Sequence, residues 1–380
     1  RKYHGIAGHE KYLDECIKAA ERFIDESPYL IYKGSSTPYR DLFSSNNAIS
    51  TEVILARDYE IGLNIIHNAN NYTLSNTYGM PGLNKKIVDS YLKSDGSRFT
   101  DVPGYSTMEF YQEMQGRDPR LTQTVRGPGY TRIGQTARLS PDFSCSTTGY
   151  QLTKWVTDVS QDGYNKSYND IILFRAAEVY LNFAEAKAER GTLTQDDINK
   201  SIKPIRDRVG MSNLDMKAAN ANPDPYLASN VTGYPNVSDE NKGVILEIRR
   251  ERTVELVMEP PYRSWDLFRW NECKQALNHY RPYYGCYIAG AGTYDMDNDG
   301  TPDLELYIDE ATSSCPTKLQ IGKEVILSEE TKGYIVGYPG VVHGRNWDDA
   351  RDYLWPIPAA QRTLNPALTQ NPGWDDGLNF

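Results

Sequence analysis

Two apolar stripes at helical spacing dominate the middle of the sequence and constrain its fold more than any other feature. The first stripe consists of Leu173, Ala177, Leu181, Ala184 and Ala188. The second consists of Ile198, Ile202, Ile205 and Val209. Gly191 stands where a helix cap belongs, and Thr194 with Asp197 resembles a capping box, so the pattern predicts a helix–turn–helix unit. Pro204 predicts a kink or break in the second helix.

Other periodic segments extend the helical prediction. Residues 10–24 have apolar positions at helical spacing, and residues 85–92 and 244–258 are also predicted helices. Short strands are predicted at residues 51–59, 304–308 and 334–336. The stretch from 122 to 169 is rich in Gly, Ser and Thr and has apolar residues without a period, which predicts irregular chain lying on the surface.

The composition excludes several classes of protein. The net charge of -10 argues against a nucleic-acid partner, which would need a basic face. No run approaches the roughly 18 apolar residues of a membrane-spanning helix. The five cysteines form no CxxC motif, which argues against a zinc site. Cys273 and Cys286 could pair, or the cysteines could be free buried thiols.

The glutamates of residues 247–255 are the first candidates for acid–base catalysis, because paired carboxylates can act as acid and base. Arginines alternate with these carboxylates, so the pattern favours a structural network of ion pairs. No GxSxG, HExxH or phosphate-loop motif is present. Trp265 and Trp270 are predicted to pack in the core, and Trp355 and Trp374 to anchor the tail.

One acidic segment has the pattern of a cation-binding loop. Its candidate ligands are Asp295, Asp297, Asp299, Thr301, Asp303 and Glu305. Carboxylates at alternate positions around Gly300 suit calcium, which takes several oxygen ligands around a sharp turn. The last acid, Glu305, comes one residue early for a calcium loop. The alternative is an Asp/Asn-Gly hairpin turn that leads into the strand predicted at 304–308.

Four motifs in series resemble one protein family. They are RAAEVYLNFAEA (175–186), EIRRERTVEL (247–256), YRSWDLFRW (262–270) and the tail with YLWPIP (353–358) and NPGW (371–374). In this order and spacing the chain resembles the SusD/RagB family of nutrient-binding lipoproteins of the Gram-negative outer membrane. The resemblance implies a mostly α fold, a tetratricopeptide-like helical scaffold with large irregular loop-rich segments and a few short strands.

The resemblance also implies how the chain is organised. A single SusD-like domain would cover residues 1–380 and lack its N-terminal part. Its expected parts are helical-repeat elements at 10–26 and 171–210, Arg/Glu/Trp helices at 243–272, a loop-rich insertion at 280–340 and an extended C-terminal tail at 350–380.

A polar loop rich in Asn and Tyr is the main candidate for ligand binding. Sugars have apolar faces and hydroxyl rims, so their sites combine aromatic rings with amide hydrogen-bonding groups. Residues 64–82 supply this mixture, and in the similar family the corresponding loop helps to form the binding face. The candidate residues are Asn68, Asn71, Tyr72, Asn76 and Tyr78. Tyr283 and Tyr284 form a second candidate group.

The resemblance implies non-catalytic capture of an extracellular nutrient, with an oligosaccharide favoured, and its delivery to a SusC-like TonB-dependent transporter. The protein would lie at the cell surface of the outer membrane, attached through an N-terminal lipid anchor absent from this chain. Two alternatives stay open, a RagB-like lipoprotein that binds peptides and a glycoside hydrolase that uses Glu/Asp pairs. No cofactor is expected apart from a structural calcium ion at the acidic loop.

Overall fold

The computed structural model describes residues 2–259, 262–278, 283–341 and 345–378. The helices are α1 His9–Glu26, α2 Pro38–Ser44, α3 Ala69–Leu74, α4 Lys85–Ser90, α5 Phe110–Glu113, α6 Pro119–Thr122, α7 Ala176–Arg190, α8 Gln195–Asp207, α9 Met216–Ala221, α10 Pro225–Ala228, α11 Lys242–Glu255, α12 Tyr262–Arg269, α13 Cys273–Leu277 and α14 Ala359–Leu364. The strands are β1 Val53–Arg57, β2 Ile171–Arg175, β3 Tyr284–Ile288, β4 Gly292–Tyr294, β5 Leu304–Tyr307, β6 Thr317–Gln320 and β7 Gly333–Val336. The mostly helical prediction is therefore confirmed.

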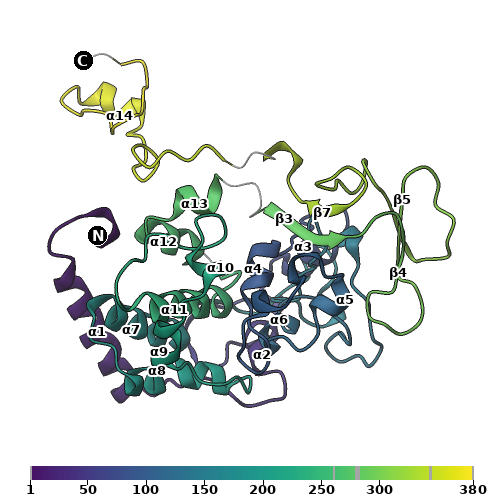
Figure 1. The fold of residues 1–380 in the computed structure, drawn as a ribbon, viewed down its shortest axis with the longest axis horizontal. Helices are drawn as coiled ribbons and strands as arrows, with labels where there is room; N and C mark the ends of the chain where they lie inside the picture. Colours follow the sequence, from purple (N-terminus) through teal and green to yellow (C-terminus); the bar gives the residue numbers. More distant parts are fainter. Residues whose placement is uncertain (1, 260–261, 279–282, 342–344, 379–380) are drawn as a thin grey trace.

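The helical half of the molecule is organised around α7, which contacts α1, α8 and α11 (Figure 1). The first hydrophobic core contains the apolar face of α11, four residues of the first predicted stripe (Ala177, Leu181, Ala184 and Ala188) and three of the second (Ile198, Ile202 and Ile205). Leu173 instead lies in β2 and is 41% exposed, and Val209 follows α8 and packs on the third core. Gly191 ends α7 in the left-handed region at φ 73°, and Thr194 with Asp197 forms the capping box of α8. The local signals for this helix–turn–helix unit were therefore read correctly from the sequence.

Pro204 does not break α8, which continues to Asp207. A proline in a helix removes one backbone donor, so the carbonyl of the residue four positions earlier loses its partner. Because Pro204 lies in the last turn, few residues follow it and the helix ends soon afterwards. The predicted break at this position was wrong.

A second hydrophobic core lies under irregular chain. Residues 122–169 contribute Val125, Phe143, Tyr150 and Leu152 to this core, all at most 3% exposed. The prediction that this stretch lies on the surface was wrong. Backbone pairing such as Val125 with Leu152 satisfies polar groups without a regular element, so no period appears in the sequence.

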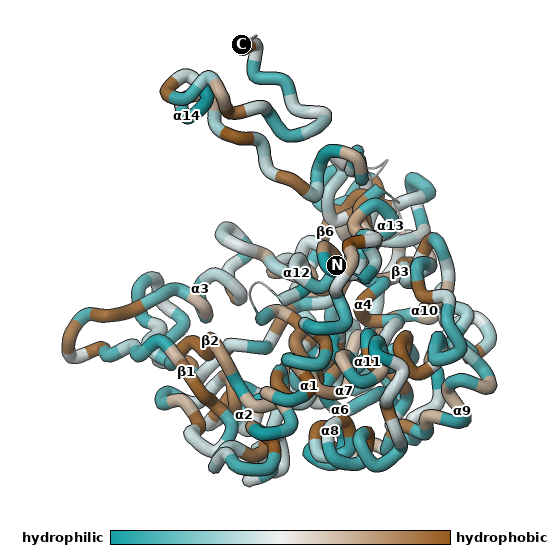
Figure 2. Tube along the Cα trace, turned by 90° about the vertical axis from the view of Figure 1, so that its left-hand side faces the viewer, coloured by the Kyte–Doolittle hydropathy of each residue, from teal (hydrophilic) through white to brown (hydrophobic). Residues whose placement is uncertain are grey.

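Three small sheets complete the fold. Strand β1 pairs antiparallel with β2, β3 pairs antiparallel with β7, and β5 lies between antiparallel β4 and parallel β6. The strands predicted at 51–59, 304–308 and 334–336 are confirmed as β1, β5 and β7. The segment 280–340, predicted as loop-rich, also contains β3, β4 and β6. Figure 2 shows β1 and β2 projecting from one side of the body.

A buried network of charges joins α11 to four other segments. Its members are Arg120, Arg175, Arg206, Arg208, Glu52, Glu251, Glu255 and Glu259. Arg175 donates from Nη1 to Glu52 Oε1 at 2.8 Å and to Glu255 Oε1 at 2.6 Å. Burial would raise the pKa of Glu255, but the surrounding arginines outweigh it and lower that pKa. The structural interpretation of these carboxylates is confirmed.

The burial of the tryptophans differs in part from the prediction. Trp270 is 1% exposed and donates to Glu185, whereas Trp265 is 63% exposed on the outer face of α12. Trp355 in the C-terminal segment is 79% exposed, although Trp374 donates to the carbonyl of Leu354 at 2.8 Å. Trp265 and Trp355 were therefore wrongly predicted as packed residues. All five cysteines are free.

No helix in the described part of the chain has both the length and the apolar character that crossing a bilayer demands.

Candidate functional site

Tyr72 and Tyr78 form an exposed aromatic pair on the loop predicted to bind ligand. Their ring centroids lie 5.3 Å apart at an interplanar angle of 82°, and the residues are 46% and 52% exposed. Tyr72 belongs to α3, a helix within a segment that the sequence presented as loop only. Gly79 follows Tyr78, and a Cβ there would lie 2.5 Å from the Tyr72 ring, so glycine allows the loop to close over this ring.

The asparagines of this loop chiefly hold it to the body. Asn68 Nδ2 donates to Asn165 Oδ1 at 2.8 Å, and Asn71 Nδ2 donates to the carbonyl of Asp162 at 3.2 Å. Asn70 is fully buried, and its Oδ1 accepts from the backbone of Thr157. Asn76 is exposed at the loop tip. The structure therefore presents the two tyrosines on a loop fixed by amide contacts.

The second candidate group lies elsewhere. Tyr284 in β3 stacks on Tyr334 with centroids 4.7 Å apart, and the Tyr283 hydroxyl donates to the carbonyl of Leu277 at 3.0 Å. Burial raises the pKa of Tyr283, consistent with its half-buried position. Figure 2 shows α3 and β3 well separated, so the structure does not bring the two tyrosine groups together.

A pocket between α4, α11 and α12, here called the α4–α11–α12 pocket, was missed by the sequence analysis. Its volume is about 480 Å³, and its walls are largely apolar, with Leu83, Ile87, Leu256 and Met258 among the lining residues. Gly82 lines it as well, four residues after Tyr78, so consecutive Cα spacing keeps the two within about 15 Å. The pocket and the tyrosine pair therefore belong to one region of the molecule.

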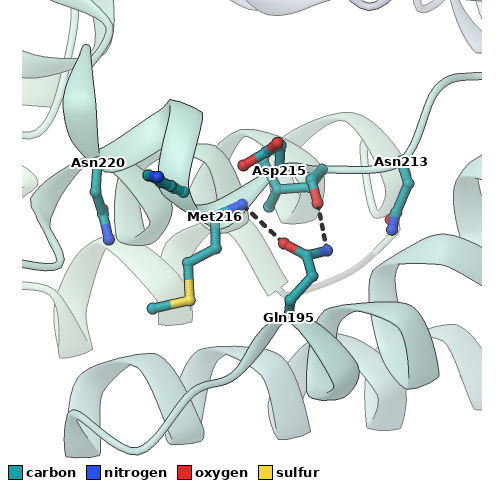
Figure 3. Close-up of a pocket in the computed structure, with 7 residues that line it drawn as sticks. Gln195, Asn213, Asp215, Met216 and Asn220 are labelled. Atoms are coloured by element: carbon teal, nitrogen blue, oxygen red, sulfur yellow. Dashed lines mark hydrogen bonds between the residues drawn. The ribbon is translucent and has the colours of Figure 1, made fainter.

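A larger but shallower hollow of about 730 Å³ lies beside α8 and α9 (Figure 3). Gln195, one of the polar residues that line it, uses its side chain to hold two backbone segments together. Gln195 accepts from the backbone of Met216 at 3.0 Å and donates to the carbonyl of Leu214 at 2.9 Å. No aromatic residue is among those that line it. The hollow lacks the aromatic surface that a sugar site uses, so the tyrosine loop is the better candidate.

The acidic loop between β4 and β5 brings part of the predicted cation site together. Oxygen atoms of Asp295, Asp297 and Asp303 all lie within 4.8 Å of one another. Asp297 Oδ1 is buried and has no hydrogen-bond partner among the described residues. Burial, followed by the charges of the neighbouring aspartates, raises the pKa of Asp297. These three carboxylates fit a hard cation such as calcium, whose charge would relieve their repulsion.

The other three predicted ligands lie outside this cluster. Asp299 accepts from the backbone of Thr301 at 2.8 Å, which makes a local turn. Glu305 accepts from the backbone and hydroxyl groups of Thr312 and Ser313, and these bonds lower its pKa to about 2. Asp295 also accepts from the backbone of the turn, as the hairpin alternative requires.

A helical scaffold that commits its buried glutamates to arginines and carries exposed tyrosines on a loop has the form of a binding protein. The sequence matches the SusD family over residues 45–374, so the chain belongs to this family.

Solved structures support the fold. A SusD-like protein of Bacteroides fragilis is 20% identical, with a TM-score of 0.59 over 96% of this chain and 62% of that one. A SusD-like carbohydrate binding protein of the same species is 22% identical, with a TM-score of 0.59 over 94% of this chain and 61% of that one. This chain thus spans less than two thirds of the length of either protein. The comparison with curated proteins found no match.

Proposed function

We propose that this protein captures an extracellular oligosaccharide without catalysis and passes it to a TonB-dependent transporter of the outer membrane. The observation that carries the proposal is the exposed pair of Tyr72 and Tyr78 in a member of the SusD family. Half-exposed tyrosine rings offer an apolar surface for the C–H face of a sugar, and their hydroxyls stay wet. The carbohydrate-binding relative from Bacteroides fragilis supports a glycan as the ligand class.

Location and attachment follow from the same proposal. The protein would act at the cell surface as a lipoprotein of the outer membrane. Its binding partner would be a SusC-like barrel, with the family membership as support.

The test is calorimetry with a panel of oligosaccharides on the wild type, Tyr72→Ala and Tyr78→Ala. Loss of one aromatic surface should weaken binding about tenfold, since such contacts contribute on the order of 1–2 kcal/mol. Tyr12→Ala is the matched control, because Tyr12 is 49% exposed and lies on α1, which packs on α7 in the helical half of the molecule. Melting temperatures should stay nearly unchanged in all three variants.

Three outcomes would contradict the proposal. Normal binding by both loop variants would place the site elsewhere, with Tyr283 and Tyr284 as the next residues to change. Binding of peptides in preference to glycans would favour a RagB-like function. Hydrolysis of a glycan that disappears in Glu251→Gln, without unfolding, would indicate a glycoside hydrolase.

A further inference from the structure

One cation that lines the α4–α11–α12 pocket, Arg263, has no counter-ion in the part of the chain that the structure describes. Among its charged lining residues, Arg252 pairs with Asp266 at 3.0 Å, and Glu259 pairs with Arg175 at 2.7 Å. Arg263 has no carboxylate within 4.0 Å among the described residues. An arginine beside a largely apolar pocket without a counter-ion is a candidate for binding an anionic ligand.

The hydrogen bonds of Arg263 leave donors available. Its Nη1 donates to the Tyr234 hydroxyl at 2.9 Å and to Thr253 Oγ1 at 3.1 Å, both neutral acceptors. No described residue accepts a hydrogen bond from its Nε or Nη2. These two nitrogens form one edge of the planar guanidinium, the geometry that binds a carboxylate through two parallel bonds. Contacts to two fixed hydroxyls hold the guanidinium in place.

A second basic side chain, Lys86, lies near Arg263. Lys86 on α4 is buried, and burial, followed by the nearby charge of Arg263, lowers its pKa to about 7. The carboxylate that acts on Lys86, Glu272, also pairs with Arg249 at 3.3 Å, and burial raises the pKa of Glu272 to about 7. An incoming anion would therefore relieve the repulsion between Lys86 and Arg263.

The pocket rim holds bulky residues in a strained backbone conformation. Met258, which lines the pocket, has φ 59°, and Trp155, whose Nε1 donates to the Met258 carbonyl at 3.2 Å, has φ 72°. Bulky residues at positive φ cost of order 1 kcal/mol or more, and such strain gathers at ligand sites. The volume of about 480 Å³ is that of a pocket for a small ligand or one to two sugar rings.

We infer that the α4–α11–α12 pocket binds a carboxylate-bearing sugar residue, such as a uronic or sialic acid, through the guanidinium of Arg263. The inference rests on the proposed function, because the same glycan would extend across the nearby Tyr72 and Tyr78. The apolar wall from α4 and α11 would contact the ring of the sugar, and Arg263 would select for its acid group.

The test uses an array of neutral oligosaccharides and of oligosaccharides that contain uronic or sialic acid, followed by calorimetry on the best acidic binder and its methyl ester. The ester keeps the sugar and removes the charge, so it should bind at least about tenfold more weakly. Arg263→Gln should lose that discrimination and bind both forms alike. Arg57→Gln is the control, since it removes the same charge from the end of β1, outside the pocket.

The outcomes separate this inference from the proposed function. Binding of neutral glycans that depends on Tyr72 and Tyr78, with no preference for acidic sugars, would overturn the inference and leave the proposed function standing. A preference for the acid that survives in Arg263→Gln would also overturn it. Absence of any glycan binding would contradict both the inference and the proposed function. Arg263→Lys keeps the charge but not the planar guanidinium, so it should recover only part of the preference for the acid over its methyl ester. This variant also tests whether a folded protein with a different cation at this position still responds to the charge of the ligand.

Discussion

At the scale of single residues, the two tryptophans of the YRSWDLFRW motif differ most clearly in how far they are buried. Trp270 packs on Tyr234 and Arg249, with centroid distances of 5.4 and 4.5 Å, and is 1% exposed. We expect Trp270→Ala to lower the free energy of unfolding by about 3–5 kcal/mol, the usual effect of deleting a large buried ring. Trp265→Ala should change it by no more than about 0.5 kcal/mol, because Trp265 is 63% exposed.

Denaturant unfolding of both variants, monitored by circular dichroism, tests these two predictions. Equal destabilisation of the two variants would mean that the outer face of α12 is covered in the folded protein. The sequence motif alone could not separate the two tryptophans, because both lie in one short helix and only the position of α12 on the body distinguishes its faces.

Lys86 gives a prediction that depends on pH. Its amine has no described hydrogen-bond partner, and burial lowers its pKa from 10.5 to about 7, so the folded protein binds this proton less tightly than the unfolded chain. The contribution of Lys86 to stability should therefore rise as pH increases from about 7 to 10.5 and be absent below that window. Lys86→Met should be more stable than the wild type near neutral pH, and the difference should shrink toward alkaline pH.

Scanning calorimetry across this pH range measures the difference. Lys85→Met is the comparison, because the adjacent Lys85 is paired with Asp89 and Glu113 and its loss should destabilise the protein. A constant gap between Lys86→Met and the wild type at all pH values would contradict the assigned pKa.

At the scale of elements, the loop between β4 and β5 makes calcium binding testable. Asp295, Asp297 and Asp303 repel one another unless a cation joins them. If calcium binds the folded state alone, it should stabilise the protein by about 2.7 kcal/mol at a concentration one hundred times the dissociation constant. Thermal melting with calcium and with chelator measures this gain, which Asp297→Asn should largely remove.

Asp309→Asn is the control for the same charge change, since Asp309 is exposed and follows β5. No shift with calcium, or an equal shift in Asp297→Asn, would leave a hairpin turn held by Asp295 as the sufficient account of this loop.

Elements with a strong period were predictable, and those defined by pairing were not. The stripe of α7 and the capping box at Thr194 reflect local chemistry, so both could be read directly. Val125 and Leu152 pair across irregular chain, and no local signal marks such contacts. The exposure of Tyr72 and Tyr78 followed from the polar loop around them. The α4–α11–α12 pocket could not be predicted from the sequence, because its walls come from segments more than a hundred residues apart that come together only when the chain folds.

At the scale of the whole molecule, the segment after β1 carries apolar residues that project from the body (Figure 2). Ile61, Leu63 and Ile65 are 52%, 72% and 41% exposed. Exposed apolar groups of this kind mark interaction surfaces, so we propose this segment as part of the contact with the transporter. When the protein is isolated from outer membranes in mild detergent, Leu63→Asp should reduce the amount of barrel partner that is recovered with it.

Leu30→Asp is the matched control, because Leu30 is 57% exposed outside this segment. If the protein covers the mouth of the proposed transporter barrel, the complete interface should exceed the roughly 1,600 Å² of an ordinary complex. Recovery of the native protein without any partner would contradict the proposed role, and equal recovery with both variants would place the contact elsewhere.

The buried charge network also sets the order of events as the chain is made. Arg120, Arg175 and Arg208 are synthesised before Glu251, Glu255 and Glu259, the carboxylates that they bind. Until residue 259 is available, closing the core would bury these three arginines with only Asp118 and Glu52 as counter-ions. Burying a charge without its full set of partners costs several kcal/mol. The arginines must therefore stay hydrated while α11 is still missing. The body of the protein should accordingly fold late and cooperatively, with α11 as the segment whose arrival completes it.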